Sequence, residues 1–248
     1  MEKKIDDLFE YRKLPQLLSK GNYSKSSTLY RALVQLQIAI YHLDLYLEEN
    51  WKTKKSELSR YWKDIYSCIK HLGISKKRGE VYLKDIQRYQ KHELQLRTNK
   101  LPTEYSVEYY YYYKSCDVKL MRRIIYDYIP ELKKDYSLAD WRIFDLITEI
   151  NDDVEDLFED MENINGNYFL LALCQEEKSQ VYTHFNDYLK SLAPRTKNRF
   201  NSKNRAQKQL KSWTLSELKQ SQILLKKQVG KWNDGKKKKV LMLDRVLS

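Results

Sequence analysis

The chain has 248 residues with 42% hydrophobic and 32% charged content, which is enough for one large domain or two small ones with a real core. Only six Gly and four Pro occur, and apolar residues recur at helical rather than alternating spacing. These features exclude a β-rich fold and predict an all-α protein. The formal net charge of +12 permits a nucleic-acid partner, so its distribution along the chain matters.

The hydrophobic periodicity predicts a series of amphipathic helices separated by short breaks that contain Gly, Pro, Ser and Asn. In chain order, we expect them at 4–19, 26–50, 53–72, 78–97, 104–128, 137–162, 173–191 and 205–229. This pattern is typical of a single helical bundle, which we expect to span residues 1–194.

The excess positive charge belongs to the C-terminal segment. Residues 195–248 contain 16 Lys and Arg against three acids, which leaves 30 basic and 31 acidic residues in positions 1–194. We therefore expect a near-neutral helical domain followed by a basic extension, either disordered or folded over a cavity mouth. In the latter case, its cations would bind a negatively charged ligand.

The N-terminus and the cysteines indicate the compartment. "MEKKIDDLFEYRK" has no apolar signal segment, and no window is apolar enough to span a membrane. Three cysteines, Cys68, Cys116 and Cys174, have neither zinc-site nor disulfide spacing. We expect a soluble cytoplasmic protein in which the cysteines are small buried residues.

The stretch "NDDVEDLFED", residues 151–160, contains six carboxylates within ten positions. On a continuous helix, Asn151, Glu155 and Glu159 form a row beside the apolar stripe, whereas Asp152 and Asp156 point nearly opposite it. Oxygen ligands one helical turn apart suit Mg²⁺, which shares its shell with water and substrate phosphates. The alternative is an ordinary acidic helix surface. The spacing does not fit the alternate ligands of a calcium-binding EF-hand.

This stretch, followed by "MENINGNYFLLAL", resembles the second metal-binding motif of the class I isoprenoid synthases. In the terpene synthase form, Asn151, Glu155 and Glu159 take the three ligand positions, although Glu155 replaces the usual Ser or Thr. Asp152, Asp153 and Asp156 also match the D-D-x-x-D of prenyl diphosphate, squalene and phytoene synthases. The resemblance covers roughly residues 26–190 and implies a helical bundle around a central apolar cavity.

The resemblance also implies a second acidic helix upstream. "YHLDLYLEEN" supplies Asp44 and Glu48 one turn apart, on a helix that is apolar in most directions. Buried carboxylates require compensation, which is either a metal ion or an interior cation such as Arg31.

A run of five tyrosines, Tyr109 to Tyr113, lies between the two acidic helices. Their rings either line a cavity and stabilise carbocations, or pack with their hydroxyls toward water. Lys114, Arg122 and Arg123 follow this run. The resemblance implies that Lys114 and Arg123 are candidates to bind a diphosphate.

The implied activity is that of a Mg²⁺-dependent terpene synthase, which ionises a prenyl diphosphate and releases pyrophosphate. Asp44, Glu48, Asn151, Asp152, Glu155 and Glu159 would be the metal ligands, with Asp44, Asn151, Glu155 and Glu159 essential for turnover. A prenyltransferase of the same fold is the alternative, and a homodimer is compatible with either.

Two other classes of function depend on the basic segment. A nucleic-acid-binding or scaffold protein would use its cations, with Trp213 and Trp232 stacking on bases. A membrane-surface protein would use "LKQSQILLKKQVGKW" as an amphipathic anchor, which also suits an enzyme with a hydrophobic substrate. The enzyme interpretation expects no nucleic-acid partner.

Overall fold

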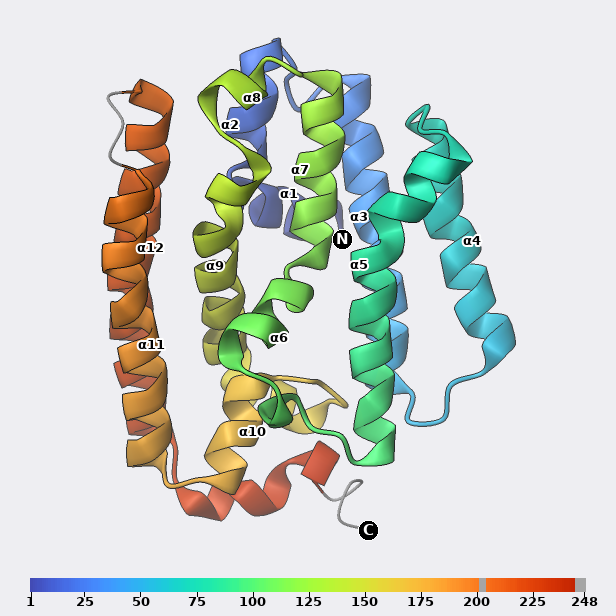
Figure 1. Ribbon diagram of the computed structural model, residues 1–248. Coiled ribbons are helices and arrows are strands. Elements are labelled where there is room, and N and C mark those ends of the chain that lie inside the picture. Colours follow the sequence, from blue (N-terminus) through green and yellow to red (C-terminus); the bar gives the residue numbers. More distant parts are fainter. Residues whose placement is uncertain (201–203, 244–248) are drawn as a thin grey trace. The chain divides into compact units, whose positions relative to one another are not determined.

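The computed structural model describes residues 1–200 and 204–243, and this part of the chain is helical without any strand. The all-α prediction is therefore confirmed for the described residues. The helices form two compact units, one made of residues 1–91 and 116–134, the other of residues 92–115 and 135–248. Figure 1 identifies the helices of each unit by label.

The first unit is built on α3 (Thr28–Glu49), which is buried around most of its circumference and packs against α1, α4 and α7. The Ser27 side chain caps this helix by accepting a hydrogen bond from the backbone N–H of Tyr30. The other helices of the unit are α1 (Glu2–Tyr11), α2 (Leu14–Leu18), α4 (Lys55–His71), most of α5 (Lys76–Gln95), α7 (Cys116–Tyr128) and most of α8 (Leu132–Asp135).

The second unit is built on α9 (Arg142–Glu155), whose apolar residues pack mainly against α12, and also against α6 and α10. The predicted apolar stripe is confirmed, since Ile147, Ile150, Val154 and Leu157 are all buried. The remaining helices of the unit are α6 (Val107–Lys114), α10 (Tyr168–Gln175), α11 (Lys178–Arg199) and α12 (Arg205–Lys231). Two short 3₁₀ segments, η5 (Asp156–Phe158) and η6 (Asp160–Glu162), lie between α9 and α10, and a third, η7 (Asp234–Lys239), follows α12.

Three of the predicted helices are each two helices in the structure. Lys13 adopts a left-handed conformation, with φ of 61°, and separates α1 from α2. Ser115 ends α6, with its hydroxyl bonded to the backbone oxygen of Tyr112. Glu176 and Glu177 separate α10 from α11, and α11 then continues through Pro194 to Arg199, where a break was expected.

The basic C-terminal segment contributes a packed helix to the second unit. In Figure 1, α11 and α12 lie side by side and run in opposite directions. The apolar residues Leu210, Leu218 and Leu225 of α12 are buried, and so is Trp232, which leaves its ring no access to a nucleic-acid base. The parts of the expected extension at 201–203 and 244–248 lie outside the described residues.

Cys116 is buried as expected, whereas Cys68 and Cys174 are half-buried, and no disulfide joins the three. Among the described residues, no helix has the length and apolar character needed to cross a membrane.

Candidate functional site

Helix α9 carries buried carboxylates as well as apolar residues. Asp145, Glu149 and Asp153 are spaced by four residues and are at most 4% exposed. Together with Asp152, they occupy about 100° of the helix circumference. Asp145 and Glu149 were not among the predicted site residues, although their regular spacing along a helix was a detectable signal.

Asp153 is the centre of a buried polar network. One of its carboxylate oxygens, Oδ2, accepts hydrogen bonds from the Tyr111 hydroxyl at 2.7 Å and from the backbone N–H of Tyr168 at 2.8 Å. The other, Oδ1, forms an ion pair with the Lys114 ammonium group. This carboxylate therefore fastens the end of α6 and the start of α10 to α9.

The electrostatics of this network favour the charged form of the lysine. Burial alone would lower the pKa of Lys114, but the attraction of Asp153, Tyr110 and Asp160 together outweighs it, and the pKa is raised well above its ordinary value. Burial and the nearby negative charge of Asp153 also raise the pKa of Tyr111. Lys114 is therefore a permanently charged partner of Asp153.

Asn167 and Asp160 fix the segment between α9 and α10. The Asn167 side-chain amide donates to the backbone oxygen of Asp153 and to Asp160 Oδ2, both at 2.7 Å, and its oxygen caps α10 at the Leu170 N–H. Asn165 donates to the other Asp160 oxygen at 2.9 Å. Burial raises the pKa of Asp160 to about 7, although Lys114 and Asn167 oppose the shift.

These side-chain bonds explain why α9 ends early. The backbone oxygen of Asp153 accepts from Asn167, and that of Glu155 accepts from Gln228 Nε2 of α12 at 3.1 Å. Side chains therefore satisfy carbonyls that a continuing helix would pair with its own N–H groups. The predicted helix to residue 162 is wrong, and Glu159 follows η5 rather than a further turn of α9.

The candidate site is the group of four carboxylates at this helix end, Asp152, Glu155, Asp156 and Glu159, called the acidic cluster below. Asp152 is half-buried and the other three are exposed. Partial burial of the Asp156 carboxyl raises its pKa to about 6, and repulsion from Asp152, Glu159 and Glu155 adds to the shift. Negative charge is therefore in local excess here.

The structure separates the predicted ligand row on this helix. Glu155 and Glu159 belong to the acidic cluster, whereas Asn151 is only 5% exposed. Of Asp152 and Asp156, which were expected to point away from the apolar stripe toward solvent, Asp156 is exposed and Asp152 is half-buried. In the described part of the chain, no group of three or more His, Cys, Asp and Glu side chains is arranged to hold a metal ion.

The upstream acids, Asp44 and Glu48, are half-buried on α3 in the first unit. They follow Gln37 by seven and eleven residues, so the three side chains share one stripe of the helix. Gln37 donates a hydrogen bond to Asp117 at the start of α7, at 2.8 Å. Gln37 therefore contacts the start of α7, and Asp44 and Glu48 continue the same stripe toward the end of α3. Arg31, considered as an interior cation, is exposed.

The two predicted diphosphate ligands are both engaged in ion pairs. Lys114 binds Asp153, and Arg123 binds Asp85 of α5 at 3.1 Å in the first unit. Arg122 is buried and donates to the backbone oxygen of Arg12.

The tyrosine run divides between the interior and the surface. Tyr110 and Tyr111 are buried, and the Tyr110 hydroxyl donates to the backbone oxygen of Gly166 at 2.6 Å. Tyr109 is exposed, and its ring stacks on that of Tyr105 with centroids 5.2 Å apart, whereas the Tyr113 ring, 4.9 Å away, is tilted by 59°. The two buried tyrosines therefore donate hydrogen bonds, Tyr111 to Asp153 in the buried network and Tyr110 to the backbone of the neighbouring loop at Gly166.

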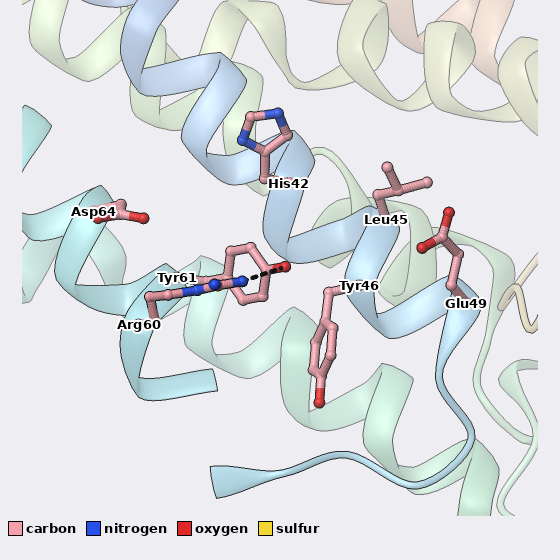
Figure 2. A pocket seen from close by; sticks show the side chains of 7 residues that line it. All are labelled: His42, Leu45, Tyr46, Glu49, Arg60, Tyr61 and Asp64. Carbon is pink, nitrogen blue, oxygen red and sulfur yellow. Dashed lines mark hydrogen bonds between the residues drawn. The ribbon is translucent and has the colours of Figure 1, made fainter. Parts of the chain in front are cut away.

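A surface cleft of about 440 Å³ lies between α3 and α4 in the first unit (Figure 2). The rings of Tyr46 and Tyr61 lie 5.2 Å apart across it. The α3 residues that line the cleft occupy the side of the helix opposite to Asp44 and Glu48. The lining consists of His42, Leu45, Tyr46, Glu49, Arg60, Tyr61 and Asp64.

Comparisons with protein-family models, with curated proteins and with solved structures find no match to this chain.

Proposed function

We propose that the protein is a magnesium-dependent class I terpene synthase, which ionises a prenyl diphosphate and releases pyrophosphate. The observation that carries this proposal is the acidic cluster at the end of α9, where crowded carboxylates contribute to a pKa of about 6 for Asp156. None of Glu155, Asp156 and Glu159 forms an ion pair with a described Lys or Arg. A bound divalent cation would remove their mutual repulsion.

Two carboxylates, Asp152 and Asp156, are the proposed protein ligands of Mg²⁺. Asp152 and Asp156 are four residues apart, and Asp156 lies at the solvent surface, where water and phosphate oxygens can complete the coordination. Two carboxylates suffice, because Mg²⁺ usually keeps several waters and shares its shell with substrate phosphates. Glu155 and Glu159 flank the pair. When bound, the ion would supply positive charge that stabilises the leaving diphosphate.

Asn151 has a different place in this proposal from the one that the resemblance implies. Its burial on α9 makes it a supporting residue of the cluster. Asp44 and Glu48, on α3 of the first unit, are the second pair of metal ligands that the resemblance implies. A central apolar cavity that excludes water from the allylic cation is part of the same proposal.

Lys114 has a positioning role. Its ion pair with Asp153 joins α6 to α9 one residue away from Asp152, and its charge lowers the pKa of Asp156. It thereby fixes the backbone that carries the acidic cluster and favours the ionised form of Asp156, which is the form that binds a cation.

The test is the release of pyrophosphate from geranyl, farnesyl and geranylgeranyl diphosphates, with and without Mg²⁺. Asp156→Asn should abolish the release, whereas Asp187→Asn on α11, an exposed acid outside the cluster, should leave it unchanged. Release that requires a second isoprenoid substrate would instead assign a prenyltransferase. No release from any of the three substrates, with the fold intact, would refute the proposal.

A further inference from the structure

The outer face of α12 combines basic residues with one exposed apolar side chain. The helix carries seven Lys and Arg and a single acid, Glu217. Ile223 is 56% exposed, more than any other large hydrophobic side chain that the structure describes. A single exposed apolar side chain is common on protein surfaces, so Ile223 is informative only together with the charged side chains around it.

Ile223 is surrounded by lysines. Lys219, Lys226 and Lys227 precede or follow it by three or four residues, the spacing at which side chains are neighbours on a helix. All three lysines are exposed, and none forms an ion pair within residues 1–200 and 204–243. Lys208 extends the row toward the start of the helix, since it lies within about 20° of Lys219 and Lys226.

Two arginines of the basic segment have internal partners. Arg195 binds Glu108 at 2.9 Å, and Arg199 binds Asp140 at 2.7 Å. The lysines around Ile223 therefore differ from these arginines, because they are available to an external anion.

The apolar side of α12 is not available for membrane insertion. Leu218, Leu225 and Val229 of this helix are buried within the second unit. The predicted amphipathic anchor at 218–232 is wrong in this respect, since its hydrophobic side faces the protein interior. Any membrane contact must use the opposite, basic face.

We infer that this face, Lys219, Ile223, Lys226 and Lys227, adsorbs to an anionic phospholipid surface, with the lysines on headgroup phosphates and Ile223 between the headgroups. The lysines are attracted to anionic lipids within about one Debye length, and a single apolar side chain adds to the binding without anchoring the protein. A nucleic-acid backbone would use the same lysines but has no use for an exposed isoleucine at their centre. The inference does not depend on the chemistry at α9.

The experiment is co-sedimentation of the full chain with phosphatidylcholine vesicles, with and without phosphatidylserine, at low and high salt. We expect binding that requires phosphatidylserine and weakens with salt. The triple variant Lys219→Gln, Lys226→Gln and Lys227→Gln should bind at least about tenfold more weakly, and Ile223→Ser at least about threefold.

The matched control removes the same charge elsewhere. Lys63, Lys70 and Lys77 are exposed on α4 and α5, and their triple replacement by Gln should leave vesicle binding near the wild-type value. Equal loss in this control would overturn the inference, because net charge alone would explain binding. So would the absence of phosphatidylserine-dependent binding, or lysine-dependent binding to duplex DNA that Ile223→Ser leaves unchanged.

Discussion

Lys114 and Asp153 form an ion pair in which the carboxylate is 1% exposed, although the two residues are 39 positions apart in the sequence. The carboxylate is also bonded to Tyr111 and to the backbone of Tyr168. A buried charge with this many partners cannot lose one without leaving another uncompensated. The pair is therefore the main electrostatic link among α6, α9 and α10.

Removing one partner of this pair should destabilise the protein strongly. We expect Lys114→Met to lower the free energy of unfolding by about 3–5 kcal/mol, because Asp153 would remain buried without its cation. Denaturant unfolding measures the change. The double variant Lys114→Met with Asp153→Asn should recover part of the loss, and a double variant less stable than Lys114→Met would contradict this account.

The stability of the protein should depend on the charge of Asp160. The folded state raises its pKa from 3.8 to about 7, so it favours the protonated form. The stabilisation is fully present below about pH 4 and is lost as the pH rises through about 7. Relative to Asp160→Asn, the wild type should lose up to about 4 kcal/mol over this interval. Unfolding curves across the interval test this, and a constant difference between the two proteins would contradict it. The pKa of Asp156 is also raised in the folded state, so the stability of Asp160→Asn should still depend on pH to some extent.

Gly166 should not tolerate a side chain. A Cβ atom at this position would overlap with the Glu93 carboxylate and the Tyr110 hydroxyl. We expect Gly166→Ala to lower the unfolding free energy by about 1–3 kcal/mol. Gly230→Ala in α12 is the matched control, since a Cβ there meets nothing within 4 Å. It should raise stability by about 0.5–1 kcal/mol, because alanine is the better helix former. Equal effects of the two substitutions would contradict the packing argument.

The acidic cluster should bind Mg²⁺ in the absence of substrate. Millimolar Mg²⁺ should raise the melting temperature of the wild type and have a smaller effect on Asp156→Asn, because binding to the folded state alone stabilises it. Removing the negative charge next to Asp156 should also lower its pKa, so we expect a lower value in Asp152→Asn by NMR titration. Equal melting shifts in wild type and Asp156→Asn would place any metal binding elsewhere.

Local sequence patterns predicted the helices well, because apolar spacing and caps act within a few residues. The apolar stripe of α9 and the positions of α3, α4 and α5 were obtained in this way. The end of α9 at Glu155 could not be predicted, since Asn167 and Gln228 bind its last carbonyls from distant segments. For the same reason, Lys114 was predicted to bind the substrate diphosphate. Its actual partner, Asp153, lies 39 residues away, and no residue near Lys114 in the sequence indicates this ion pair.

The prediction for the ligand row depended on a helix that continued to residue 162. Once α9 ends at Glu155, the positions of the acids follow from η5 and η6 and no longer from a regular 100° rotation. The sequence therefore indicated where negative charge accumulates, but not which carboxylates are exposed. Asp145 and Glu149, buried on the same helix, show that acids in this chain also serve the interior.

The measurement that tests the central proposal most directly is pyrophosphate release from the three prenyl diphosphates by the purified protein, with and without Mg²⁺. We expect Mg²⁺-dependent release together with a hydrocarbon product, and loss of this release in Asp156→Asn but not in Asp187→Asn. Absence of release from every substrate by a folded wild-type protein, or undiminished release by Asp156→Asn, would contradict the proposal.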